Sequence, residues 1–83
     1  MYSVFWTGLK CYNQEPGGSA TVIDCDYLGG ASYCAKMVAP SGVARTCGIE
    51  LITDAFEPLG LTSAGCRSMS GYTFCLCASD KCN

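Results

Sequence analysis

The sequence contains no histidine and little charge. Asp, Glu, Lys and Arg make up 14% of its 83 residues, and the formal net charge is −2. Without histidine, the chain has no imidazole to serve as a general base or a metal ligand. Its five basic residues are scattered and form no stripe, which excludes a nucleic-acid partner and argues against attachment to an acidic membrane surface.

Long apolar runs are also missing. No segment approaches 18 consecutive apolar residues, so no transmembrane helix is expected. Residues 1–6 are apolar but lack the length and the basic front of a signal peptide.

Cysteine, in contrast, is abundant. An even number of cysteines in a chain this short predicts an oxidising compartment and four disulfides. A domain of this size rarely holds together by its core alone, and each disulfide typically adds about 2–4 kcal/mol. Zinc is the competing interpretation, but there are no histidines and no paired C-x2-C knuckles. The eight cysteines are Cys11, Cys25, Cys34, Cys47, Cys66, Cys75, Cys77 and Cys82.

Disulfides imply secretion, so we expect that a signal has been removed before this chain. Residues 1–8 then form an N-terminal arm outside a single domain of residues 9–83. The arm is either an added start or a signal remnant, a strand added to the sheet, or a contact surface. Its large apolar side chains are Tyr2, Val4, Phe5 and Trp6.

Short strand signals recur between turn signals, which predicts an all-β, small disulfide-rich domain. A first hairpin is expected from residues 10–12 and 20–25, on either side of the turn NQEPGG. A second is expected from residues 32–38 and 43–47, which flank Ala-Pro-Ser-Gly. Residues 71–76, aromatic and β-branched, predict a final strand.

The segment between Cys47 and Cys66 is the least regular. We expect a strand over residues 49–52, then one helical turn over residues 54–57, with Asp54 as its cap. Pro58 and Gly60 follow and end the turn. Three large apolar residues of this segment are expected in the core, with surface contact as the alternative: Phe56, Leu59 and Leu61.

The inventory of reactive groups predicts a protein that is not an enzyme. Every cysteine has an expected disulfide partner, so none is available as a nucleophile. Asp24 and Asp26 flank Cys25, but residues two apart on a strand share a face and form a solvated acidic patch more often than an acid–base pair. The glycine pairs lack the strand–helix context of a phosphate loop. No cofactor and no metal are expected.

The C-terminal run is the most specific feature of the sequence. Cys75-Leu-Cys77-Ala-Ser-Asp-Lys-Cys82-Asn83 resembles the signature that ends three-finger domains of the Ly6/uPAR family, in an invertebrate variant with one residue between the paired cysteines. The opening Leu-Lys-Cys-Tyr at residues 9–12 matches as well. The segments at residues 33–36 and 43–47 are similar to the central finger of the family.

This resemblance covers residues 9–83 and implies a three-finger, snake-toxin-like fold. It also implies four pairings that the spacing alone does not give, because eight cysteines allow 105. The gap from Cys47 to Cys66 is longer than the family pattern, so the residues leave the partner of Cys66 open. The implied pairs are Cys11–Cys34, Cys25–Cys47, Cys66–Cys75 and Cys77–Cys82.

The resemblance further implies a structural role for Asn83, whose side chain would hydrogen-bond the backbone of neighbouring fingers. The alternative is a frayed terminus. For partner binding, the tip of the second finger is unusually apolar for a solvated loop, which suggests contact with another protein. The alternative is a tip that folds back on its neighbours. The candidate partner-binding residues are Met37, Val38, Ala39, Pro40 and Val43.

We therefore expect an extracellular protein-binding module. By resemblance it is held on the cell surface by a GPI anchor attached after this segment, and it modulates a membrane receptor or an ion channel or mediates adhesion. One alternative is a freely secreted toxin-like or pheromone-like ligand. A second is the ligand-binding ectodomain of a single-pass receptor. A structural coat component without a specific partner is a further alternative.

Overall fold

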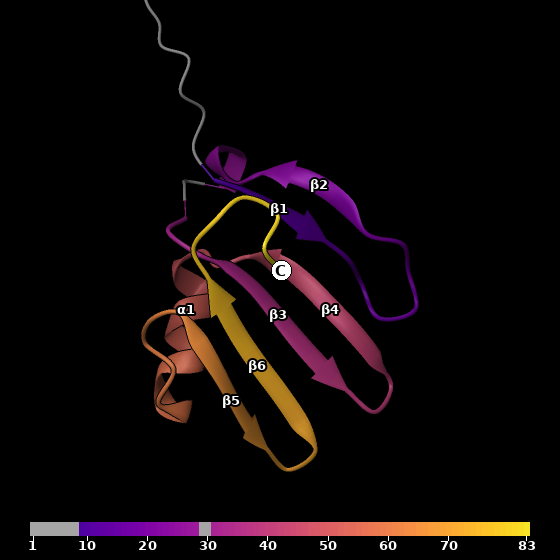
Figure 1. Cartoon of the computed structure of the whole chain (residues 1–83), viewed down its shortest axis with the longest axis vertical. Coiled ribbons are helices and arrows are strands. Elements are labelled where there is room, and N and C mark those ends of the chain that lie inside the picture. The colour runs from indigo at the N-terminus through magenta and orange to yellow at the C-terminus, as the bar shows by residue number, and fades with distance from the viewer. Residues whose placement is uncertain (1–8, 29–30) are drawn as a thin grey trace, which may run out of the picture.

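A computed structural model of the chain describes residues 9–28 and 31–83 (Figure 1). The arm expected at residues 1–8 lies outside the described residues. No helix in the described part has the length and apolar character needed to cross a bilayer. The elements are β1 (Lys10–Asn13), β2 (Thr21–Asp24), η1 (Cys25–Leu28), β3 (Cys34–Ala39), β4 (Gly42–Cys47), α1 (Glu50–Phe56), η2 (Glu57–Leu59), β5 (Gly65–Met69) and β6 (Tyr72–Cys77).

The described strands form two antiparallel sheets. One contains β1 and β2, and the other has the strand order β4-β3-β6-β5. Consecutive strands pair as three hairpins, and β6 joins the second hairpin to the third through β3. The hairpins run from the C-terminal loop toward the lower right of Figure 1. The prediction of a small all-β domain is confirmed.

Two tight turns set the registers of the larger sheet. Pro40 and Ser41 connect β3 to β4, and Ala39 is paired with Gly42. Ser70 and Gly71 connect β5 to β6 with φ angles of 54° and 84°. Two consecutive positive φ values match the twist of a two-residue hairpin, and glycine adopts such values without steric cost.

The segment after β4 differs from the expectation. Residues 49–52, expected as a strand, lead into and form the first turn of α1, and Ile49 rather than Asp54 precedes the helix. Ile52 and Phe56 are four residues apart, so both reach one hydrophobic cluster from one side of the helix. That packing outweighs the weak strand preference of the β-branched residues.

The expected helical turn at residues 54–57 is present, and the helical segment continues past Pro58 through η2. It ends at Gly60, as expected, where φ is 82°. Of the three expected core residues, Phe56 and Leu61 are buried, whereas Leu59 is only partly buried and lies outside the cluster. Strand β5 was not expected, because its residues carry no β-branched or aromatic signal.

The core has two parts. The first, which we call the hub, consists of four cysteines that are fully buried, with Leu9, Ile23 and Ile49 packed around them. The second lies between α1 and the four-stranded sheet. Its buried members are Ala35, Phe56, Leu61 and Leu76.

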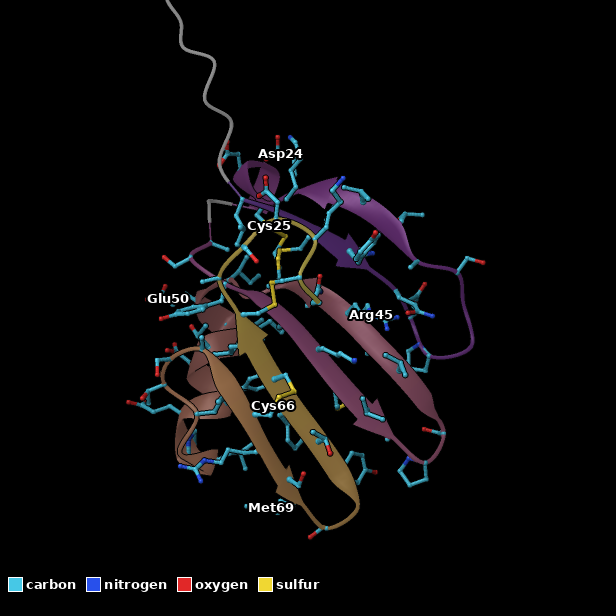
Figure 2. The ribbon with its side chains drawn as sticks, in the orientation of Figure 1. Asp24, Cys25, Arg45, Glu50, Cys66 and Met69 are labelled. Carbon is cyan, nitrogen blue, oxygen red and sulfur yellow. A yellow bond between two sulfur atoms is a disulfide. The ribbon has the colours of Figure 1, made fainter. Side chains whose placement is uncertain are left out.

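The structure contains four disulfides, and no cysteine is free. Two of them connect residues more than twenty positions apart and hold the first hairpin to the second within the hub. Figure 2 shows Cys25 where the disulfides gather, and Cys66 along the β5–β6 hairpin. The pairs are Cys11–Cys34, Cys25–Cys47, Cys66–Cys75 and Cys77–Cys82, which are those the resemblance implies.

Candidate binding surface

The side chain of Asn83 joins three strands. Its Oδ1 accepts a hydrogen bond from the N–H of Tyr12 at 2.9 Å. Its Nδ2 lies within hydrogen-bond distance of three carbonyl oxygens, those of Tyr12 (3.0 Å), Ala35 (2.7 Å) and Thr46 (3.2 Å). Only 9% of Asn83 is exposed, so these bonds form away from bulk water. Because all its polar atoms are engaged with backbone, this amide holds β1, β3 and β4 together.

The first hairpin also covers one edge of the four-stranded sheet. The backbone N–H of Gln14 donates to the carbonyl of Arg45 at 2.8 Å, and the N–H of Arg45 donates to the carbonyl of Gln14 at 3.0 Å. The Arg45 guanidinium donates to the Gln14 side chain and to the carbonyl of Asn83. Figure 2 shows Arg45 on β4, beside the loop of the first hairpin. The outer side of β4 is therefore paired at this position.

The registers divide the four-stranded sheet into two faces, because side chains alternate along each strand and directly paired residues share a face. We call the face that packs against α1 the helix face. Lys36, Val38, Val43 and Arg45 lie on the opposite face. The helix face carries Ala35, Met37, Ala39, Ala44, Thr46, Gly65, Arg67, Met69, Tyr72, Phe74 and Leu76.

The candidate partner-binding residues do not form one surface. Met37 and Ala39 lie on the helix face, whereas Val38 and Val43 are paired with each other on the opposite face. Pro40 is exposed in the turn between the two strands. The expected residues are therefore divided between the two faces of the hairpin and its turn.

Helix α1 covers only part of the helix face. Phe74 packs edge-to-face on Phe56 at 5.3 Å, and on its other side Tyr72 stacks on Phe74 at 6.2 Å between ring centroids. Beyond these rings the surface is apolar and open, with Tyr72 41% and Met69 51% exposed. We call this area the distal patch. It consists of Met37, Ala44, Met69, Tyr72 and Phe74.

An apolar groove of about 160 Å³ adjoins the distal patch. It runs between α1 and the β3–β4 hairpin, and Ile52, Phe56, Met37 and Ala44 line it. The sequence indicated Met37 as a contact residue but did not indicate Tyr72 and Phe74, the aromatic half of the distal patch. That half depends on the pairing of β6 with both β3 and β5, and β5 has no strand signal in the sequence.

The acidic pair beside Cys25 has a local role. The N–H of Asp26 donates to Oδ1 of Asp24 at 3.1 Å and lowers the pKa of the Asp24 carboxyl below its usual value. Lys10 also contacts this carboxylate at 3.3 Å and lowers the pKa further. The Asp24 carboxylate is therefore held in its charged form by neighbours within the first hairpin.

The buried sulfurs offer no metal site. Those of Cys11, Cys25 and Cys47 lie within 4.8 Å of one another. Each is bonded in a disulfide. A metal requires thiolates, which these sulfur atoms cannot provide while oxidised.

Comparison with known proteins gives no relative. The chain matches no family model. No curated protein and no solved structure matches it either.

Proposed function

We propose that this chain is an extracellular protein-binding module of the Ly6/uPAR type, with a three-finger fold. Three hairpins that extend from a disulfide hub support this proposal. The four cysteine pairs and the contacts of Asn83 agree with the pattern that the sequence resemblance implies. The hairpins present broad exposed surface, which suits recognition of another protein.

The single observation that carries the binding function is the distal patch. Aromatic and methionine side chains are rarely left in the open as a contiguous group unless a partner covers them. Tyr72 and Met69 are large, apolar and about half exposed, and they adjoin Phe74 and Met37 on the same face. Aromatic residues and methionine are also enriched where proteins meet.

By resemblance, the partner is a membrane receptor, an ion channel or another extracellular protein, and the module sits on the cell surface through a GPI anchor. The opposite face contributes less to binding, because it combines the charged Lys36 and Arg45 with the cross-strand disulfide of Cys66. The turn of the second hairpin carries Pro40 and no cation, so blockade of a receptor by a cationic tip has no support.

Binding of the labelled, oxidised chain to membranes from the source organism tests this proposal. We expect saturable binding, which the double variant Met69→Ala/Tyr72→Ala weakens at least roughly tenfold, as truncation of interface anchors typically does. The matched control is Leu51→Ala, which also removes an exposed apolar side chain (74% exposed) but lies on α1 outside the patch. Binding that does not saturate, or equal losses in both variants, would contradict the proposal.

A further inference from the structure

Strand β5 is the open edge of the four-stranded sheet. It stands last in the order β4-β3-β6-β5, and all five of its residues are exposed. Within residues 9–28 and 31–83, nothing pairs with its outer side. An exposed edge presents unpaired backbone groups to other chains, and proteins commonly block such edges.

The register identifies which backbone groups point outward. The Cα atoms of Cys66 and Cys75 are 4.1 Å apart, which is typical of a non-hydrogen-bonded pair in an antiparallel ladder. The Ser68 and Thr73 hydroxyls, two positions along, lie 3.0 Å apart, as the close side chains of the next such pair should. In non-hydrogen-bonded pairs the N–H and C=O point away from the partner strand. Cys66 and Ser68 therefore offer two donors and two acceptors at the open edge.

Arg67 lies between these two residues, on the helix face. The Arg67 guanidinium lies close to Gly60. A Cβ atom added to Gly60 would lie 3.6 to 3.8 Å from the nearest guanidinium atoms. No carboxylate in the described part of the chain forms an ion pair with it. It is also the only charged residue of β5. The edge thus carries a single cation without a partner in the described structure.

This cation selects against pairing between two copies of the chain. Two β5 strands related by a two-fold axis overlap over all five residues only when Arg67 stands directly opposite Arg67 of the second copy. Like charges directly opposite each other destabilise a strand pair. A register shifted to avoid this contact leaves only part of the short strand paired.

We propose that the β5 edge binds an extended segment of another protein as an added strand, with an Asp or Glu of that segment opposite Arg67. Strand addition of this kind gains affinity from the main chain and specificity from alternate side chains. Because side chains alternate, the residue two positions from the acid shares its face and lies beside Met69 at the distal patch. The expected motif is therefore an acidic residue and an apolar residue separated by one position.

The inference rests on the proposed function, the binding of another protein, and adds the kind of partner. The probe is a display library of ten-residue peptides of random sequence, selected against the immobilised, oxidised chain. We expect enriched peptides to carry the acid–x–apolar motif. Peptide binding should slow the amide hydrogen exchange of Cys66 and Ser68, measured by NMR.

The matched variants are Arg67→Glu and Lys36→Glu, which make the same charge change on opposite faces of the sheet. Arg67→Glu should weaken the selected acidic peptides roughly tenfold, because a cross-strand attraction becomes a repulsion. Selection on that variant should favour Lys or Arg instead. Lys36→Glu should leave the acidic preference unchanged.

Three results would overturn the inference. The first is that no peptide is enriched, or that Arg67→Glu keeps the acidic preference. The second is that peptides bind without slowing the amide hydrogen exchange of Cys66 and Ser68. If Met69→Ala/Tyr72→Ala weakens that binding, the proposed function still holds although the strand-addition inference fails. The third is a concentration-dependent dimer, seen by sedimentation, that protects the β5 amides and so identifies a second copy as the occupant.

Discussion

The two edges of the four-stranded sheet differ in whether another segment of the described chain covers them. At β4, Gln14 of the first hairpin pairs with Arg45 through two backbone hydrogen bonds, and Pro16 lies against the position of Gly42. At β5, no described residue takes the corresponding place. Among the residues that the structure describes, only the β4 side is closed, and it is the side fixed to the buried cysteines.

This difference separates the edge that stabilises the fold from the edge at which we propose binding. The β4 edge is connected to the hub through Cys47 and to Asn83 through the carbonyl of Thr46. The β5–β6 hairpin is held by its own disulfide and by the contact of Phe74 with α1. Changes near β4 should therefore lower the free energy of unfolding, whereas changes at β5 should mainly alter binding.

The largest expected effect comes from disulfide removal on the two sides. Cys25→Ala/Cys47→Ala deletes a fully buried bridge that closes a long loop, and the loss should approach about 5 kcal/mol, the upper end of the usual range. Cys66→Ala/Cys75→Ala opens a short loop with an exposed cysteine and should cost closer to about 2 kcal/mol. Denaturant unfolding of both double variants measures the difference. Equal losses would contradict the comparison.

Removal of the Asn83 amide should have the next largest effect. Asn83→Ala leaves the N–H of Tyr12 and the carbonyl of Ala35 without these partners, and a buried unpaired group costs about 1–3 kcal/mol. We expect a loss of roughly 2–3 kcal/mol in thermal or denaturant unfolding. Ser79→Ala, in the same C-terminal loop but exposed, serves as the control and should unfold like the parent chain.

Proline substitutions compare the two edges directly. Gln14→Pro removes the N–H that bonds the Arg45 carbonyl at 2.8 Å and should cost about 1 kcal/mol, with faster hydrogen exchange of the Arg45 amide. Ser68→Pro removes an N–H that points away from β6, where edge strands tolerate proline, so its cost should be smaller. Gln14→Ala keeps the backbone bond and separates the side-chain contribution. A larger loss from Ser68→Pro would show that the β5 edge has a partner within the chain.

The smallest expected effect concerns acid stability near the first hairpin. The hydrogen bond from the Asp26 N–H lowers the pKa of the Asp24 carboxyl below its usual value. A carboxyl with a lowered folded-state pKa stabilises the fold above the unfolded-state pKa, and this contribution disappears as pH falls through the folded-state pKa. Asp24→Asn should therefore slightly lower the free energy of unfolding at neutral pH. The free energy of unfolding of this variant should also fall less steeply than that of the parent chain as the pH decreases, measured by denaturant unfolding at several pH values. Asp26→Asn keeps the N–H donor and should retain the parent profile.

The sequence predicted the parts of the fold that are encoded locally. The turn at Pro40 and the alternating strand around Met37 indicated the second hairpin, and eight cysteines indicated four disulfides. The cysteine order alone did not select the partners; these came from the resemblance, and the structure contains the same pairs. The helical turn at residues 54–57 was expected, but the first part of α1 was taken for a strand, because its apolar stripe becomes favourable only when it packs on Leu76 and Phe74.

The candidate site was harder to predict than the fold. Met37 was indicated, but Tyr72 and Met69 join it only through the register of β6 with its two neighbours. The sequence also placed Val38 with Met37, although strand alternation assigns them to opposite faces. The open edge at β5 depends on which strand stands last in the sheet, and no local pattern encodes strand order.

The contacts of Asn83 have a consequence for the order of folding. They join the last residue of the sequence to Tyr12, 71 positions earlier, and to β3 and β4 between them. During synthesis the first and second hairpins can form and pair through Gln14 and Arg45, but the hydrogen bonds from the Asn83 side chain must wait until position 83 has emerged. Contacts this distant in sequence also slow the search for the native state. The hub disulfides can therefore form before the Asn83 side chain makes its hydrogen bonds to β1, β3 and β4.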